Sequence, residues 1–263
     1  MEQPLTKVRH IYEFGDNVYT EASAEVVTEY ALTVFVNGQE FVTLVCTPAE
    51  LSELVLGFIA SEGLISTVDE VKSIEVDEEA GMVYVRLHRK IEINPEHFLK
   101  RYITSCCGKG RQSFYFYNDA QTSPVTADGP KLTAQQVIAL VQQMQAQSDL
   151  FLDTGGVHNA ALCDTKTIIA SRADIGRHNA LDKLYGYMLM NHMSPSDKVM
   201  VFSGRISSEV LLKVAKMGVG ILLSKSAPTD LALQMAQNLR ITAIGFARND
   251  RFKVYTHPER ILM

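Results

Sequence analysis

The sequence predicts an α/β protein in two parts, a smaller hairpin-rich α+β region over residues 1–125 and a layered α/β domain over residues 126–263. Two observations carry this prediction. In the first half, short alternating runs flank turn residues, which is typical of hairpins. In the second half, strand-like and helix-like segments alternate, which indicates a layered unit with a largely parallel sheet. The turn-rich segment NDAQTSPVTADGPK, residues 118–131, marks the boundary.

Two hairpins are expected in the first half. The segment YALTVFVNGQEFVTLVC, residues 30–46, contains two alternating runs joined by Asn37 and Gly38. Asn-Gly is the strongest short signal for a two-residue hairpin turn. The segment VKSIEVDEEAGMVYVRLH, residues 71–88, repeats the pattern of apolar and polar alternation. Both segments are therefore predicted to form antiparallel strand pairs.

A helix is expected between these hairpins. Thr47 is the predicted N-cap, and Glu50, three residues later, would complete a capping box. An apolar stripe follows at helical spacing, and Gly63 is the predicted end of the helix.

The second half contains regular elements in alternation. A helix over 132–147 begins with the capping-box pair Thr133 and Gln136. The expected elements after it are helix 178–191, strand 198–204, helix 207–218, strand 220–226, helix 229–239, strand 241–247 and an edge strand at 252–257. An exposed edge strand invites pairing with another chain, so we expect a homodimer.

Composition argues against nucleic-acid binding and against a membrane or secreted protein. The chain has 263 residues, is 46% hydrophobic and carries a formal net charge of −5, which argues against general nucleic-acid binding. Its apolar runs are shorter than the roughly 18 residues of a membrane span, and its first residues do not form a signal peptide. We therefore expect a cytoplasmic protein without membrane contact, whose cysteines are reduced. Cys46 and Cys163 are expected to be buried apolar residues.

The other two cysteines, Cys106 and Cys107, are adjacent in TSCCGKGR. Lys109 and Arg111 follow them, and nearby cations favour the nucleophilic thiolate. Two glycines predict a mobile loop over residues 104–112. Such a loop could accept sulfur from a persulfide and pass it on, with the neighbouring thiol assisting. A redox switch and half of a metal site remain as alternatives, although C-x-x-C spacing is missing.

Small, polar and cationic residues gather at predicted strand ends and helix starts, where open α/β sheets bind ligands. Glycines permit close backbone approach, and helix N-termini offer N–H groups to anions. These candidates favour a phosphate-bearing ligand over plain turns; they are Gly155, Gly156, His158, Arg177, His178, Arg205 and Ser226. Neither histidine has a second histidine at i+4, and the zinc deaminase signature is missing, so we predict no metal site.

The motifs LVLGFIASEGLI, TSCCGKG, DTGGVHNAAL, DIGRHNALDKLYG, FSGRISSEVLLKVAKMGV, SAPTDLAL and GFARNDRFKVYTHPER carry a family resemblance. The chain resembles the FdhD family of formate dehydrogenase accessory sulfurtransferases over about residues 28–260. This resemblance implies a cytidine-deaminase-like three-layer α/β/α domain without a zinc site. It also implies transfer of sulfur from a cysteine desulfurase to the molybdenum bis(guanine dinucleotide) cofactor, before the cofactor enters the formate dehydrogenase apoprotein.

The resemblance also assigns residues. It implies a persulfide on Cys106 or Cys107, and Cys107 is favoured because Lys109 and Arg111 lie on its side. It implies cofactor binding, which a guanine nucleotide could mimic, by Phe246, Ala247, Arg248, Asn249, Asp250 and Arg251. The chain departs from the family in two places. CCGKG replaces a pair of cysteines separated by two residues, and Ala173 stands where an acidic residue is commoner.

Two other functions fit parts of the sequence. One is a cofactor-binding chaperone in which the thiols form a redox latch. Adjacent cysteines disfavour this latch, because their Cα atoms are ~3.8 Å apart whereas relaxed disulfides prefer about 5.5–6 Å. The other is a sugar-phosphate-binding enzyme, suggested by FSGRISSE, which leaves the cysteine loop without a role.

Overall fold

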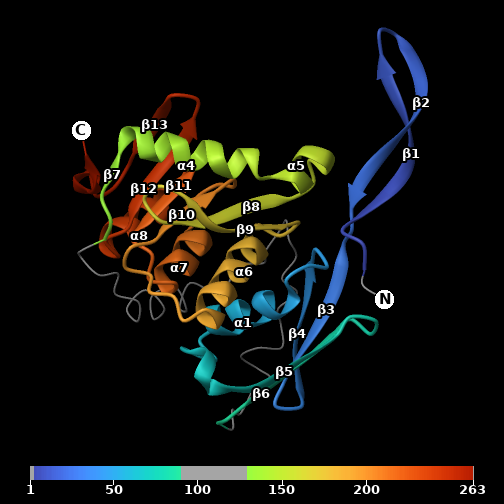
Figure 1. The fold of residues 1–263 in the computed structure, drawn as a ribbon, viewed down its shortest axis with the longest axis horizontal. Helices are drawn as coiled ribbons and strands as arrows, with labels where there is room; N and C mark the ends of the chain where they lie inside the picture. Colours follow the sequence, from blue (N-terminus) through green and yellow to red (C-terminus); the bar gives the residue numbers. More distant parts are fainter. Residues whose placement is uncertain (1–2, 90–128, 263) are drawn as a thin grey trace.

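The structure is a computed structural model that describes residues 3–89 and 129–262. The predicted cysteine loop and the predicted domain boundary lie outside these residues. The chain begins with a long antiparallel ribbon of two strands, β1 (Thr6–Gly15) and β2 (Val18–Val27), which extends away from the body of the molecule (Figure 1).

The two predicted hairpins are confirmed, and together they form one four-stranded sheet in the order β4-β3-β6-β5. Its strands are β3 (Tyr30–Val36), β4 (Gln39–Cys46), β5 (Val71–Asp77) and β6 (Met82–Leu87). Asn37 and Gly38 have φ angles of 51° and 84°, the left-handed conformation that a two-residue hairpin turn requires. The alternating apolar side chains of this sheet pack against helix α1 (Leu51–Ser61).

The predicted start of this helix is wrong. Thr47 does not cap it, because the Thr47 hydroxyl donates to Asp174 and to the carbonyl of Ala173. Glu50 occupies the N-cap position in a left-handed conformation, with φ 47°, and makes no side-chain capping bond. The predicted end is confirmed, since Gly63 has φ 78° and its N–H bonds to the carbonyl of Ala60.

The second half forms a six-stranded sheet in the order β13-β12-β11-β10-β8-β9. Its strands are β8 (His158–Cys163), β9 (Ile168–Asp174), β10 (Val199–Phe202), β11 (Ile221–Ser224), β12 (Thr242–Arg248) and β13 (Arg251–Val254). The prediction of a largely parallel sheet is wrong, because only β10–β11 and β11–β12 pair in parallel. β8 and β9 form a hairpin that the sequence analysis did not find, and β13 turns back on β12 as the expected edge strand.

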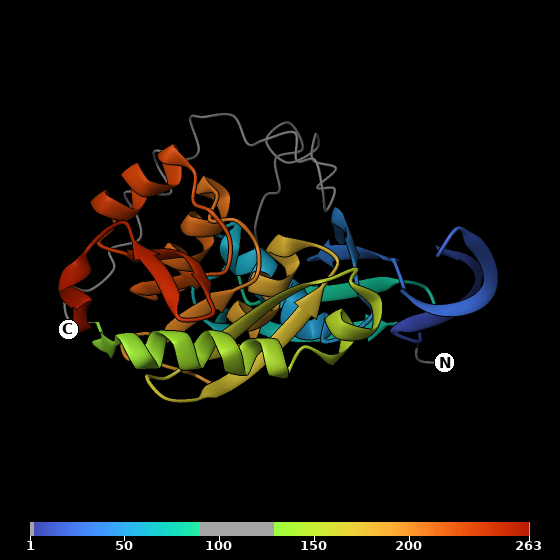
Figure 2. The ribbon, with the colours of Figure 1, turned by 90° about the horizontal axis from the view of Figure 1, so that it is seen from above.

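Helices cover both faces of this sheet (Figure 2). Helix α4 (Ala134–Ala146) lies on one face and begins with the predicted capping box. Helices α6 (Arg177–Met190), α7 (Ser208–Lys216) and α8 (Asp230–Asn238) cover the other face. A short helix, α5 (Asp149–Thr154), precedes β8, and two short strands, β7 (Leu132–Thr133) and β14 (Ile261–Leu262), pair beside α4. The result is a mixed α/β fold in which β-strands lie between helices.

Helices α1 and α6 join the two parts of the chain at an unusually close crossing (Figure 1). A Cβ atom on Gly57 would lie 1.8 Å from the carbonyl oxygen of Asp182. A Cβ atom on Gly186 would lie 1.9 Å from the carbonyl oxygen of Glu53. Both contacts are with backbone, so neither helix can admit a larger residue there without moving.

We therefore expect Gly186→Ala to lower the free energy of unfolding by about 1–3 kcal/mol, the usual effect of overpacking. Denaturant unfolding of the whole chain measures this loss. Gly15→Ala is the control, because a Cβ atom at Gly15 meets nothing within 4 Å. Equal stability of the two variants would show that the helices can separate easily.

Candidate functional site

Most of the predicted ligand-binding residues meet at one edge of the six-stranded sheet. β9, β10, β11 and β12 all end at this edge, and β8 begins there, because His158 pairs with Asp174 and Phe202 with both Ala160 and Ser224. The edge thus joins the segments that follow these strand ends. It is the position at which open α/β sheets bind ligands.

The turns after β10 and β11 are held together by backbone bonds. The N–H of Ile206 donates to the carbonyl of Ala227, and the N–H of Thr229 donates to the carbonyl of Ile206. Ser224 Oγ donates to the carbonyl of Gly204 and accepts from the N–H of Ser226. The positions of Gly204 and Ser226 are therefore fixed before any ligand arrives.

Gly204 also permits a close approach between this turn and β8. A Cβ atom there would lie 2.8 Å from the ring of Phe202 and 3.5 Å from Nδ1 of His158. The neighbouring Arg205 has an exposed side chain. A rigid turn with a free guanidinium beside it is suited to an anionic ligand.

Two histidines and an arginine stand where helix α6 begins. The pKa of His158 is lowered, first by burial and then by the positive charge of Arg177, so the ring stays neutral at neutral pH. His178 Nε2 lies 3.1 Å from Glu209 Oε2, and this contact holds the pKa of Glu209 below its usual value. Arg177 Nε is buried and has no hydrogen-bond partner within residues 3–89 and 129–262. A buried donor without a hydrogen-bond partner lowers the stability of the fold. This atom is therefore suited to bind an acceptor that a ligand supplies.

The FARNDR segment lies in the β12–β13 hairpin and reaches the same edge. The N–H of Phe246 donates to the carbonyl of Ser226, which connects the hairpin to the turn after β11. Phe246 has φ 54°, and Lys253 Nζ lies 4.8 Å from the centre of its ring. Asn249 and Asp250 form the turn, and the side chains of the last four residues are exposed; these are Arg248, Asn249, Asp250 and Arg251.

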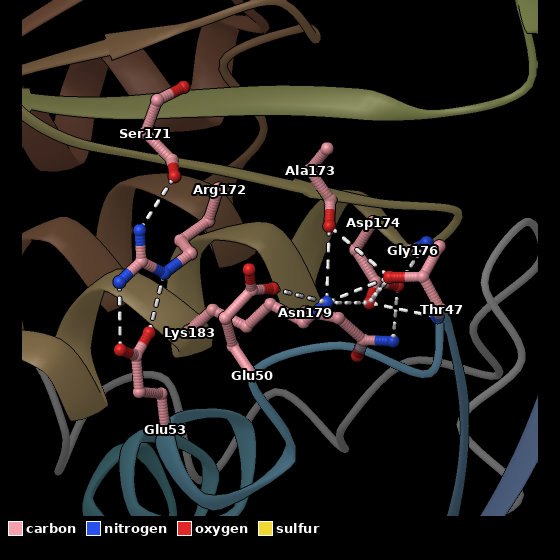
Figure 3. A network of polar contacts seen from close by, with 10 residues as sticks. All are labelled: Thr47, Glu50, Glu53, Ser171, Arg172, Ala173, Asp174, Gly176, Asn179 and Lys183. Carbon is pink, nitrogen blue, oxygen red and sulfur yellow. Dashed lines mark hydrogen bonds and ion pairs between the residues drawn. The ribbon is translucent and has the colours of Figure 1, made fainter. Parts of the chain in front are cut away.

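A buried network, which the sequence analysis missed, fixes the start of α6 (Figure 3). The side chains of Asp174 and Lys183 are 0% exposed, and Lys183 Nζ lies 2.9 Å from Asp174 Oδ2. Lys183 also donates to Thr47 Oγ1 at 2.7 Å and to the carbonyl of Ala173 at 3.1 Å. Asp174 accepts from the N–H of Gly176.

The network extends from the sheet edge to the N-terminal part of the chain. Asn179 Nδ2 donates both to Asp174 and to the carbonyl of Val45 at the end of β4. Nearby, Arg172 makes a bidentate contact with Glu53 of α1, with N–O distances of 2.6 and 2.7 Å (Figure 3). The orientation of α6, and with it that of Arg177 and His178, therefore depends on contacts with β4 and α1.

Four other predicted residues lie elsewhere. Gly155 ends helix α5 with φ 64°, and Gly156 packs on the side chain of Val27 at the base of the ribbon, although both precede His158 closely in the chain. Cys46 and Cys163 are buried, as expected, and burial raises the pKa of each thiol to about 12. These two thiols are poor nucleophiles.

In the described ranges, no group of three or more His, Cys, Asp and Glu side chains is arranged to hold a metal ion. None of the described helices has the length and apolarity needed to cross a membrane.

Comparisons with known proteins agree on one family. The model of the FdhD/NarQ family matches residues 27–262. The sulfur carrier protein FdhD of Bacillus subtilis (strain 168) is 54% identical over 261 residues, which cover 99% of both chains. The protein of the same name from Staphylococcus aureus (strain MRSA252) is 48% identical, and the alignment covers 100% of this chain and 98% of the relative.

One solved structure has the same fold. It is the crystal structure of a formate dehydrogenase accessory protein from Desulfotalea psychrophila, with a TM-score of 0.81. The superposition covers 98% of this chain and 100% of the other, at 24% sequence identity.

Proposed function

The chain belongs to the FdhD/NarQ family and is a sulfur carrier for formate dehydrogenase, and we propose that it carries the sulfur as a persulfide on Cys107 or Cys106. In this proposal the donor is a cysteine desulfurase, and the acceptor is the molybdenum bis(guanine dinucleotide) cofactor, bound as a substrate at the sheet edge. The observation that carries the cofactor site is that separate turns bearing glycines and exposed arginines meet at that edge.

Loading needs no external oxidant. A loop thiolate attacks the outer sulfur of the desulfurase persulfide, and a new S–S bond forms on the loop cysteine. The S–S bond in the desulfurase breaks, and its cysteine leaves as a thiolate. Lys109 and Arg111 favour this step by stabilising the attacking thiolate.

Delivery of sulfide uses the second cysteine. Its thiolate attacks the inner sulfur of the persulfide, so the outer sulfur leaves as sulfide toward the cofactor and the two cysteines form a disulfide. A bridge between adjacent residues is strained and therefore easily reduced. A cellular dithiol then restores both thiols, and the carrier returns to its resting state.

The sheet edge supplies the groups that a guanine dinucleotide needs. Arg205 and Arg248 are exposed cations beside rigid turns, and guanidinium groups bind phosphate in a bidentate manner. The unpaired Arg177 Nε is a further donor for a phosphate oxygen. Neutral His158 could donate or accept a hydrogen bond without adding charge. We assign the sheet edge to cofactor binding on these grounds.

We expect Arg205→Ala and Arg248→Ala each to weaken guanine nucleotide binding about ten- to a hundredfold, since a charge-assisted hydrogen bond contributes roughly 1.5–3 kcal/mol. Titration calorimetry with GDP measures the change. Arg86→Ala, an exposed arginine in the other sheet, is the matched control. Unchanged affinity in both edge variants would place the nucleotide elsewhere.

The proposal also covers the partners of the carrier, the layering of its larger domain and its class of activity. The carrier would contact the formate dehydrogenase apoprotein and the desulfurase in the cytoplasm. The described sheet with helices on both faces supports the layering of a cytidine-deaminase-like domain, and we propose that this domain holds no zinc. We class the protein as a sulfurtransferase, because it would transfer a sulfur atom from the desulfurase to the cofactor.

A further inference from the structure

His158, the first residue of β8, stands at the sheet edge between β9 and the turn after β10. It pairs with Asp174 at the end of β9. Its Nδ1 atom would lie 3.5 Å from a Cβ atom placed on Gly204 in that turn. No group in residues 3–89 and 129–262 makes a hydrogen bond with either ring nitrogen. Both nitrogens can therefore bind a ligand at this edge.

The charges that face His158 keep its ring neutral in the free protein. Burial lowers its pKa most, and the positive charges of Arg177 and His178 on α6 lower it further. Asp174 acts in the opposite direction, but its carboxylate is already paired with Lys183 at 2.9 Å (Figure 3). The same carboxylate accepts four hydrogen bonds from neighbouring residues. Asp174 is therefore too fully paired to offset the two cations.

The acid on α7 is also paired. Glu209, in the first turn of α7, has its Oε2 atom 3.1 Å from Nε2 of His178. This contact lowers the pKa of Glu209, so its carboxylate is ionised at neutral pH. Arg205, in the turn after β10, is exposed. Because both of these acids already have partners, an incoming anion meets the nitrogens of Arg177, Arg205 and His158.

We infer that His158 takes up a proton from solvent when a phosphate-bearing ligand binds at the sheet edge, and that it thereby favours anionic over neutral ligands. This inference rests on the proposed function, because it concerns the same site. A phosphate oxygen near the ring supplies the negative charge that the paired acids do not, and so favours the imidazolium. The added N–H donates a charge-assisted hydrogen bond to the phosphate. A neutral ligand such as guanosine induces no such change.

The affinity for a phosphate-bearing ligand should then rise as the pH falls. Below the pKa of His158 in the free protein, the ring is charged with and without ligand. Above its pKa in the complex, the ring is neutral in both states. Between these two values binding takes up one proton, so affinity increases by at most about tenfold for each unit of falling pH. We expect an increase of about three- to tenfold from pH 8 to pH 6, and none for guanosine.

The test is titration calorimetry of the full chain with GDP-mannose at about pH 6, 7 and 8, in two buffers of different ionisation enthalpy. Both phosphates of GDP-mannose are diesters and do not titrate in this range, whereas a terminal phosphate has a second pKa of about 6. The dependence of the heat on the buffer gives the number of protons taken up. We expect uptake in the wild type and none in His158→Gln, whose amide can donate a hydrogen bond but cannot titrate. His10→Gln, which removes an exposed histidine from β1, is the matched control and should behave as the wild type.

Binding of GDP-mannose without proton uptake would overturn the inference and leave the cofactor site in place. Uptake that persists in His158→Gln would also overturn it, because another group would then hold the proton. If GDP binds and GDP-mannose does not, the difference in uptake of GDP between the wild type and His158→Gln decides in the same way, since both share the titration of the GDP phosphate. If neither nucleotide binds to the wild type, the proposed cofactor site fails and this inference fails with it.

NMR of the histidine rings gives a second readout that needs no variant. When GDP-mannose is added to the wild type at about pH 7, one ring should change from the neutral to the charged form. Rings that all keep their charge state on saturation would overturn the inference.

Discussion

Lys183→Met is expected to lower the free energy of unfolding by about 3 kcal/mol, the lower end of the range for breaking a buried ion pair. Lys183 and Asp174 are both fully buried, so the variant leaves a carboxylate in the interior without its cation. The loss should be near the lower end, because Asp174 keeps four hydrogen bonds from Thr47, Gly176 and Asn179. Denaturant unfolding of the full chain measures it.

Two further variants separate the ion pair from the general effect of replacing a lysine. Lys72→Met removes an exposed lysine from β5 and should change stability by less than about 0.5 kcal/mol. Asp174→Asn/Lys183→Met removes both charges of this pair and should recover part of the loss. If Lys183→Met were as stable as Lys72→Met, the buried pair would not hold α6 in place.

Cys106→Ser/Cys107→Ser is expected to abolish formate dehydrogenase activity in cells that lack the native carrier. Serine cannot form a persulfide, and the remaining cysteines are buried thiols with pKa values raised to about 12. Among the single variants, Cys107→Ser should lose more activity than Cys106→Ser, because Lys109 and Arg111 lie nearer to Cys107 in the sequence.

The pair Cys46→Ser and Cys163→Ser provides the control for loss of a thiol outside the loop. Each should keep activity wherever the protein still folds. Greater activity of Cys107→Ser than of Cys106→Ser would reverse the assignment of the carrier thiol. Full activity of either single variant would contradict delivery through the second cysteine, because that variant keeps only one loop thiol. Full activity of both would in addition show that either thiol can carry sulfur.

Local signals in the sequence predicted most of the regular elements. The Asn37-Gly38 turn, the Thr133–Gln136 capping box and the αL glycine at 63 each specify a local structure with few competing contacts. The meeting of Arg205, Ser226 and Phe246 at one edge was also predictable, since the parallel strands β10, β11 and β12 end on the same side.

The errors arose where distant residues override local preference. Thr47 has the sequence context of an N-cap, but its hydroxyl is bound by Asp174 and Lys183, which lie more than 120 residues away. Nothing local distinguishes the buried Lys183 from a solvated helix lysine. The DIGRHNALDK motif contains both charges of the pair, and their joint burial becomes evident only when α6 is packed against β4 and α1.

The most direct test of sulfur carriage is the intact mass of the protein after incubation with a cysteine desulfurase and cysteine. We expect the wild type to gain the mass of one sulfur atom, a reductant to remove it, and Cys106→Ser/Cys107→Ser to gain none. Loading of this double variant to the wild-type level would contradict sulfur carriage by the cysteine pair, because the sulfur would then reside outside it.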